Sequence, residues 1–388
     1  MKRAALEIQN VVLVSYDSVR ADVAYSGRLP GLEALRRRGA TFASCVASAP
    51  YTPVSHATVM TGLQPYHHGI RHLFRESLDP ACQTLATRLG ARGFDTSAVV
   101  SCPGLHRWYQ IGRGFRRYDD EIPRLPDGTD PLETVDVKLR GRAMKRAPLA
   151  VERSRAMLED TPPGSFLHFL HFFDAHWPYE PPQAHDPAAH NPYEGEVAFL
   201  DHHFSTWLSW MESTGRLDKT LIVLFGDHGE DLNGWYPDDR GGEALGHPEE
   251  MGHGCLLYDN TIRVPLVFSH PQLEPRTIGE QVRLVDIVPT VLELLGLPAE
   301  PELDGVSLAS AVLGEGAPPE LPAYSETHYP REQAAATGDY DWTRNKKSVR
   351  IGNRWKVIFH VDSDLVEVYD LERDPHERRD LLTGGGEP

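Results

Sequence analysis

The stretch Val11-Val12-Leu13-Val14-Ser15-Tyr16-Asp17 is an apolar, strand-like run that ends in an acidic residue. Two later stretches repeat this pattern: Phe166 to Phe173 leads into Asp174-Ala175-His176, and Leu221 to Gly226 leads into Asp227-His228. In open α/β sheets the ligand-binding crevice lies at the carboxyl ends of the parallel strands, so we expect the three clusters to meet there. Aspartate and histidine are ligands of Zn²⁺ and Mn²⁺, and the pattern therefore predicts a metal site. Taken alone, each of these residues would be read as a strand-end cap or a turn residue.

Strand-like and amphipathic stretches alternate along most of the chain. This order is typical of an α/β protein with a mostly parallel central sheet flanked by helices. Helical spacing covers residues 80–92, 194–215 and 285–296, and a further strand is expected at 263–268.

The composition changes near residues 314–319, which are rich in glycine and proline. Beyond this linker, three short strand-like runs separated by turns predict a small antiparallel sheet, at 348–351, 355–359 and 366–369. We therefore divide the chain into a catalytic domain at 1–315 and a small C-terminal α+β subdomain at 316–388 that covers the site.

The charge of the chain restricts its partners. Its 56 acidic and 39 basic residues give a formal net charge of -17, which argues against a nucleic-acid polymer because phosphate backbones need a basic surface. A small anionic ester remains compatible, because bound cations reverse the field locally. No apolar stretch approaches the ~20 residues that span a bilayer, and the N-terminus lacks the apolar core of a signal peptide. We expect a cytoplasmic protein without a membrane partner, and a homo-oligomer is compatible with the sequence.

The second informative stretch runs from Ala49 to Gly62. Pro53 fits the first position of a helix, which predicts Thr52 at the N-cap, where free N–H groups and the helix dipole attract an anion. Thr52 then has two interpretations. Its hydroxyl only caps the helix, or it is a nucleophile whose pKa a bound metal lowers. The strand-end clusters favour the nucleophile.

Further motifs are spread through nearly the whole chain. They lie at 14–22, 52–62, 113–120, 174–179, 226–230, 252–259, 263–266, 286–290 and 369–375. In number, order and spacing they resemble the motifs of the alkaline phosphatase superfamily, and within it those of the sulfatase-like branch. This resemblance implies an alkaline phosphatase-like α/β fold and an enzyme that hydrolyses esters with the help of one or two divalent ions.

The resemblance also implies roles for single residues. By it, the first metal would be held by Asp17, Asp227 and His228, with Thr52 as nucleophile and fourth ligand. Zn²⁺ or Mn²⁺ suits this set of carboxylate and imidazole ligands. Ser18 stands where many sulfatases place another acidic ligand for calcium, so a calcium site is disfavoured.

His176 and His253 resemble substrate-contacting or second-metal residues of the family, and Asp174 would join them around a second ion. With two ions, one would activate the nucleophile while the other stabilises charge on the attacked ester or its leaving oxygen. With one ion, the two histidines remain as hydrogen-bond donors or as a general acid. Arg71 and His328 are predicted as further substrate contacts, although Arg71 also fits a solvated turn.

Two more histidines precede this cluster in the same apolar run. His168 and His171 lie before the end of the expected strand and on opposite faces of it, so both are predicted to be packing residues.

The nucleophile position departs from that of true sulfatases, which carry Cys or Ser there and oxidise it to formylglycine. Thr52 is a secondary alcohol whose oxidation would give a ketone, and His56 replaces the arginine of the motif. No formylglycine is therefore expected. Threonine nucleophiles in this superfamily are associated with phosphoryl transfer, so the sequence predicts a hydrolase of phosphate or phosphonate esters, of the phosphodiesterase or phosphomonoesterase type, that forms a phospho-threonine. The alternatives are a sulfate-ester hydrolase without formylglycine, a phosphoryl-group transferase, and a non-catalytic anion-binding protein.

Overall fold

The computed structural model describes residues 6–73, 75–125, 127–133, 142, 144–182, 189–232, 234–240, 252–329, 344–361 and 363–383. Its centre is an eight-stranded sheet with the order β4-β3-β5-β1-β6-β7-β2-β8. Within this sheet, each strand except β7 runs in the same direction. The predicted, mostly parallel sheet is therefore confirmed. The strands are β1 (Asn10–Tyr16), β2 (Gly39–Val46), β3 (Asp95–Val99), β4 (Arg117–Asp119), β5 (Phe166–Phe172), β6 (Thr220–Gly226), β7 (Arg263–Ser269) and β8 (Arg276–Arg283).

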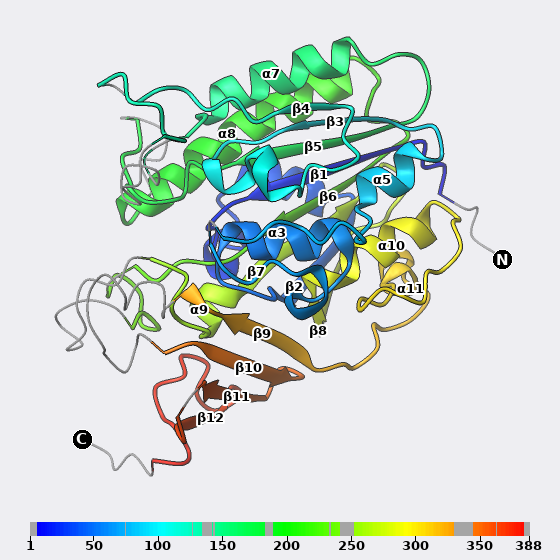
Figure 1. The fold of residues 1–388 in the computed structure, drawn as a ribbon. Coiled ribbons are helices and arrows are strands. Elements are labelled where there is room, and N and C mark those ends of the chain that lie inside the picture. Colours follow the sequence, from blue (N-terminus) through cyan, green and yellow to red (C-terminus); the bar gives the residue numbers. More distant parts are fainter. Residues whose placement is uncertain are drawn as a thin grey trace.

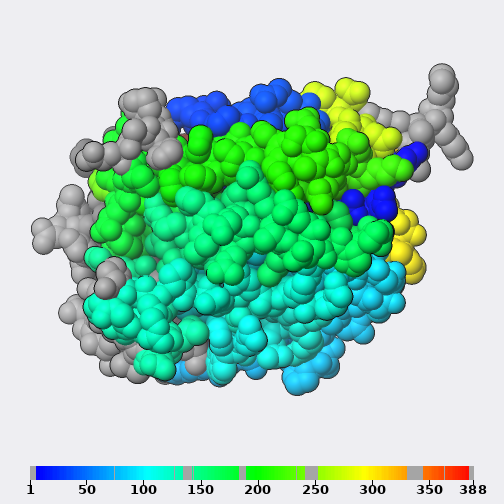
Figure 2. All heavy atoms as spheres, turned by 90° about the horizontal axis from the view of Figure 1, so that it is seen from above, coloured from blue at the N-terminus to red at the C-terminus, as the bar shows by residue number. Residues whose placement is uncertain are grey.

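Helices cover both faces of this sheet (Figure 1). One layer contains α1 (Ala21–Ala24), α2 (Pro30–Arg36), α7 (Ala147–Glu159) and α8 (Pro192–Ser213). Figure 2 looks onto this layer, where the green surface of α7 and α8 crosses the middle of the molecule. The opposite layer contains α3 (Thr52–Thr61), α4 (Pro65–His68), α5 (Leu85–Gly90), α10 (Ile287–Leu294) and α11 (Ala309–Leu313).

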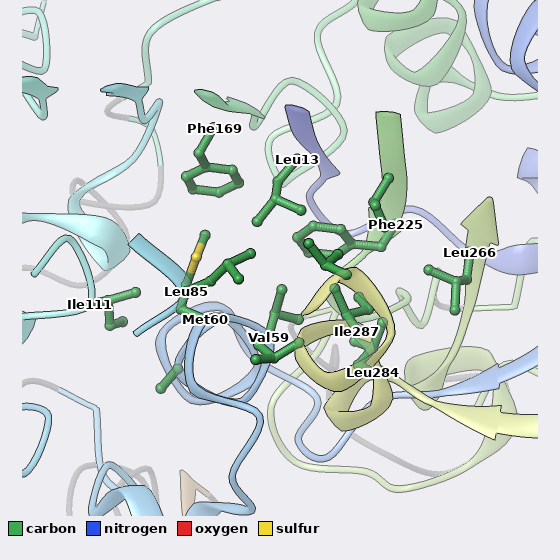
Figure 3. Packing of buried hydrophobic residues seen from close by; sticks show 14 of the residues in the cluster. Leu13, Val59, Met60, Leu85, Ile111, Phe169, Phe225, Leu266, Leu284 and Ile287 are labelled. Atoms are coloured by element: carbon green, nitrogen blue, oxygen red, sulfur yellow. The ribbon is translucent and has the colours of Figure 1, made fainter. Parts of the chain in front are cut away.

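The central strands are apolar on both sides because both faces are covered. All seven residues of β1 are buried. On the side of α3 and α10, Leu13 from β1, Phe169 from β5 and Phe225 from β6 pack in one cluster with Val59 and Ile287 of these helices (Figure 3). The alternate residues of β1 enter a second cluster with α7 and α8. The ends of β1, β5 and β6 are thus held at fixed positions by two layers of packing.

A second, four-stranded antiparallel sheet lies near the C-terminus, with the order β12-β11-β10-β9. The three predicted strands are present as β10 (Lys346–Ile351), β11 (Trp355–His360) and β12 (Val366–Asp370), and β9 (Ala323–Thr327) adds a fourth. β9 attaches to the chain just before α3, because the Glu326 N–H donates to the Ser48 carbonyl at 3.0 Å. The small sheet therefore lies beside the start of α3.

The predicted helices are present, with some different ends. α8 and α10 agree with the prediction within two residues, and Gly296, with φ 70°, follows α10 as expected. The helix expected at 80–92 is shorter, because Thr84 caps α5 and accepts a hydrogen bond from the Thr87 N–H. In the described part of the chain, no helix is long and apolar enough to span a membrane.

Candidate active site

Asp17 follows β1 in the middle of the large sheet, between the ends of β5 and β6. In the strand register, Tyr16 lies opposite both Phe172 and Gly226, so the residues that follow these three strands share one edge of the sheet. Asp17, Asp227 and His228 each offer one ligand atom within 4.8 Å of the others, and all three are buried. The predicted convergence of these three residues is confirmed.

The hydroxyl of Thr52 faces this group. Its Oγ1 lies 3.1 Å from Asp17 Oδ2 and 3.3 Å from His228 Nε2. The prediction that Thr52 caps α3 was wrong, because Tyr51 is the N-cap and Thr52 is the first helical residue. A Cβ placed on Gly104 would lie 3.5 Å from the Thr52 methyl carbon, so this loop packs against the methyl side of Thr52.

The hydrogen bonds around Asp17, Asp227 and His228 are compatible with a bound cation. His228 donates its Nδ1–H to the Gly229 carbonyl at 2.9 Å, which leaves a lone pair on Nε2. This Nε2 lies 3.4 Å from Asp227 Oδ2, a buried oxygen that accepts no hydrogen bond from the described residues, with His56 Nδ1 3.3 Å away. Several hydrogen-bond acceptors therefore lie close together here, and the Thr52 hydroxyl offers them a single proton. A buried acceptor without a donor is costly, and a divalent cation would satisfy all of them.

The pKa values in this group differ for physical reasons. Burial alone would raise the pKa of Asp17, but the hydrogen bond from His171 and the nearby His228 hold it well below its usual range. Burial and the neighbouring Asp17 carboxylate raise the pKa of Asp227. Burial, with His253 close by, lowers the pKa of His228, so its imidazole is neutral. A neutral imidazole is the form that binds metals.

His176 and His253 lie next to this group. The ring of His253 lies 4.3 Å from that of His228 and 4.8 Å from that of His176, between centroids. His253 donates its Nδ1–H to Glu230 Oε1 at 2.9 Å. Burial opposes the charged form of His253, but the Glu230 carboxylate outweighs it and raises the pKa. For His176, burial and the neighbouring His253 lower the pKa to about 4. The pKa values of the two histidines are therefore shifted in opposite directions.

Asp174 has different partners from the other predicted ligands. Its Oδ1 lies 3.1 Å from Arg146 Nε and accepts a hydrogen bond from the Ala147 N–H at 3.1 Å. Its Oδ2 is buried and accepts no hydrogen bond from the described residues, and burial raises its pKa to about 7. Asp174 thus anchors the start of α7. Among the described residues, the groups of three ligand atoms within 4.8 Å include neither Asp174 nor His176 nor His253.

Arg71 and His328 are brought together by the small sheet. Arg71 donates from Nε and Nη2 to Glu326, at 2.7 and 2.8 Å, and Nη2 lies 3.0 Å from His328 Nε2. Burial opposes ionisation of Glu326, but the neighbouring His328 and the hydrogen bonds from Arg71 lower its pKa to about 2. The Tyr51 hydroxyl donates to the Arg71 carbonyl at 2.5 Å, so this cluster borders the residue before Thr52.

Sequence reasoning missed two neighbours of Asp17. His171 was predicted to be a packing residue; it is buried, but its Nε2 also lies 3.1 Å from Asp17 Oδ2. Cys102, which follows β3, lies with Asp17 and His171 in a second group of atoms within 4.8 Å. The rule that polar residues after parallel strands converge would have found Cys102. His168, in contrast, packs between Ser97 and Ser154, as expected.

Comparisons with known proteins agree with this geometry. The family model for sulfatases matches residues 9–297, and a model described as N-sulphoglucosamine sulphohydrolase, C-terminal, matches residues 253–385. Human arylsulfatase D is 27% identical over 240 residues, which cover 58% of this chain and 37% of that protein. N-acetylglucosamine-6-O-sulfatase of Bacteroides thetaiotaomicron is 25% identical over 198 residues, covering 49% and 31%. The matches thus span about a third of the length of these curated relatives.

Solved structures share the fold over nearly the whole chain. A structure in complex with its substrate D-glucosamine-2-N,6-O-disulfate has a TM-score of 0.74 at 16% identity and covers 97% of this chain and 93% of its own. The phosphonate monoester hydrolase of Agrobacterium radiobacter has a TM-score of 0.72 at 21% identity and covers 97% and 92%. Since the sulfatase model matches well over half of the chain, including Asp17, Thr52, Asp227 and His228, this protein belongs to the sulfatase family.

Proposed function

We propose that this protein is a metal-dependent hydrolase of phosphate or phosphonate esters, with Thr52 as its nucleophile. The position of the Thr52 hydroxyl carries the proposal. Its Oγ1 lies within 3.3 Å of both Asp17 Oδ2 and His228 Nε2, at the edge of the sheet where the candidate metal ligands meet. A hydroxyl that only capped a helix would turn toward backbone N–H groups instead.

The environment of His56 supports a route without formylglycine. His56 is fully buried, donates Nδ1–H to the Thr52 carbonyl at 2.9 Å, and lies 2.9 Å from the Ser15 hydroxyl through Nε2. Burial and the neighbouring His171 lower its pKa to about 3, so the side chain is neutral. The positive charge of the sulfatase motif arginine is therefore missing next to the nucleophile. Together with the secondary alcohol of Thr52, this favours direct attack by the hydroxyl.

Asp17, Asp227 and His228 would hold the cation, which we expect to be Zn²⁺ or Mn²⁺. When bound, the cation supplies positive charge that lowers the pKa of the Thr52 hydroxyl and polarises the ester. Thr52 Oγ1, after its hydroxyl has released its proton to solvent, then forms a bond to phosphorus, and the bond from phosphorus to the alcohol oxygen breaks. His253, protonated beside Glu230, gives its Nε2 proton to that oxygen. Water later attacks the phosphorus atom bound to Thr52, loses a proton to His253, and releases the phosphate or phosphonate product and the Thr52 alkoxide.

The number of ions decides the role of the histidines. In a second version, His176, His253 and Asp174 would hold a second cation, for which their ligand atoms would have to move closer, because they form no group within 4.8 Å among the described residues; no general acid is then required. Metal analysis of the purified protein distinguishes the two versions by one or two ions per chain. Arg71 and His328 would contact the organic part of the ester in either version.

Sulfate-ester hydrolysis is the second candidate. The names of the curated relatives favour it, since arylsulfatase D and N-acetylglucosamine-6-O-sulfatase are both sulfatases. The fold does not separate the two, because a phosphonate monoester hydrolase and a structure with a sulfated sugar have similar TM-scores of 0.72 and 0.74.

The test is hydrolysis of a panel of nitrophenyl esters: a phosphate monoester, a phosphodiester, a phosphonate monoester and a sulfate. Metal-depleted protein is titrated with Zn²⁺ or Mn²⁺, beside Thr52→Ala and Thr61→Ala. Thr61 is the matched control, because it lies on the same helix and its hydroxyl donates to the Ala57 carbonyl at 2.6 Å. We expect metal-dependent cleavage of a phosphorus ester that Thr52→Ala abolishes and Thr61→Ala retains. A preference for sulfate, or activity that survives in Thr52→Ala, would contradict the proposal.

A further inference from the structure

The ring of His171 has a fixed tautomer. The backbone N–H of Ser101 donates to His171 Nδ1 at 3.1 Å, and the Ser101 hydroxyl donates to the His171 carbonyl at 2.5 Å. A backbone N–H can only donate, so Nδ1 is the acceptor and the proton of the neutral imidazole sits on Nε2. This Nε2–H points at Asp17 Oδ2, 3.1 Å away.

The tautomer excludes one role for His171. With Asp17 and Cys102, it belongs to a group of buried atoms close enough to hold a metal ion. A coordinating nitrogen needs a lone pair, however, and the lone pair of this ring is taken by the Ser101 N–H. His171 is therefore oriented to donate to Asp17 and cannot ligate through Nε2 in this arrangement.

We propose that His171 is a positioning residue for the metal ligand Asp17. Asp17 Oδ2 receives hydrogen bonds from His171 and Thr52, and Oδ1 receives one from the Ser18 hydroxyl at 2.9 Å. The bond from His171 fixes the rotation of the carboxylate, so that the free lone pairs face the other ligands. The rings of Phe169 and Phe173, with centroids 6.1 and 6.0 Å away, hold the imidazole in place. This inference rests on the metal centre of the proposed function.

His168 provides a matched control on the same strand. It is also fully buried, and both of its ring nitrogens are hydrogen-bonded, to Ser97 Oγ and Ser154 Oγ at 2.8 Å each. A change to phenylalanine removes two hydrogen bonds at either position and keeps a ring of similar size. The two variants therefore lose the same number of hydrogen bonds, but only His171 contacts a candidate metal ligand.

The experiment measures metal affinity and stability separately. Metal-depleted full-length protein is titrated with Zn²⁺, and then with Mn²⁺, by calorimetry, for the wild type and for His171→Phe, His171→Gln and His168→Phe. We expect His171→Phe to weaken metal binding roughly 10- to 100-fold, the usual cost of losing a residue that orients a ligand, and His168→Phe to leave it unchanged. The amide of His171→Gln can donate to Asp17 and should restore part of the affinity. The unfolding temperature of the metal-free protein should fall to a similar extent in both phenylalanine variants.

Three outcomes would overturn this inference. Equal metal affinity in His171→Phe and His168→Phe would remove the positioning role and leave the metal centre intact. Loss of one bound ion per chain in both His171→Phe and Cys102→Ala would make His171 a ligand instead. A wild-type protein that binds neither ion would overturn the proposed function, and this inference with it.

Discussion

Glu230 and His253 form a hydrogen-bonded pair, with 2.9 Å between Oε1 and Nδ1. The carboxylate accepts, so Nδ1 carries the proton and the Nε2 of His253 faces away from Glu230. The backbone of Glu230 is fixed as well, because Arg20 Nη1 donates to its carbonyl oxygen at 3.1 Å. The pair therefore sets the orientation of the His253 ring between the rings of His228 and His176.

Glu230→Gln should shift the pH dependence of the reaction. Removing the carboxylate lowers the pKa of His253, which the wild-type pair raises. If His253 protonates the leaving oxygen, activity falls as pH rises through that pKa, so the variant will lose activity at a lower pH than the wild type. The measurement is kcat/KM against pH for an alkyl ester, whose leaving oxygen needs a proton. A nitrophenyl ester, whose leaving group does not, is the control and should show no shift. If the fall of kcat/KM at high pH is the same in the variant and the wild type for the alkyl ester, His253 does not protonate the leaving oxygen.

Gly252→Ala should damage activity more than stability. Gly252 has φ 74°, and a Cβ there would collide with Glu230 Oε1, the atom that holds His253. Gly215 is the matched control, because it has φ 68° and its added Cβ would meet nothing closer than Asp218 Oδ2 at 3.9 Å. Each substitution should cost about 1 kcal/mol of stability from the backbone conformation. Only Gly252→Ala should also lower kcat, and equal kcat values in the two variants would contradict this account.

Asp227→Asn should stabilise the metal-free protein and abolish its stabilisation by metal. Oδ1 would keep its hydrogen bonds from the Ser18 and His228 N–H groups, and the new amide would lie 3.4 Å from the His228 Nε2 lone pair and 3.3 Å from His56 Nδ1. Removing a buried carboxylate oxygen that accepts no hydrogen bond from the described residues should gain about 1–3 kcal/mol. The measurement is thermal unfolding with a chelator and with Zn²⁺.

The control for this substitution is Asp201→Asn, which should have the opposite effect. Asp201 is also buried, but it accepts hydrogen bonds from the Tyr16 hydroxyl and from the N–H groups of Gly31 and Leu32. An amide there would place a donor against donors, so stability should fall. Destabilisation of the metal-free Asp227→Asn variant would mean that Asp227 Oδ2 has a donor.

The sequence predicted the parts of the site that follow strands. Asp17, Asp227 and His228 come directly after apolar runs, and the geometry of a parallel sheet places such residues at one edge. Thr52 was recognisable from its helix and its motif. The orientation of its side chain could not be predicted. The hydroxyl donates its proton to Asp17, which lies 35 positions away, whereas helix-cap preferences concern only neighbouring residues.

Residues within the strands were harder to assign. His168 and His171 both look like packing residues in an apolar run, and only the pairing of β5 with β1, which sets His171 opposite Ser15, brings one ring to Asp17. Likewise, β9 was not predicted, because its pairing with β10 depends on a segment far away in sequence. Contacts that depend on strand register are long-range and leave no local signal.

Glu367→Gln should weaken the small sheet at neutral pH and have no effect in strong acid. Burial opposes ionisation of Glu367, but hydrogen bonds from His360 Nε2 at 2.5 Å and the Tyr258 hydroxyl at 2.6 Å lower its pKa to about 2. Because this pKa lies below that of the unfolded chain, about 4.5, the ionised carboxylate stabilises the fold above that pH. The stabilisation, up to about 3 kcal/mol, is lost as pH falls from about 4.5 to 2. Denaturant unfolding of both proteins at pH 7 and at pH 2 to 4 tests this, with the exposed Glu372→Gln as control. A difference between wild type and Glu367→Gln that stays constant over this pH range would show that the carboxylate acts through packing and not through its charge.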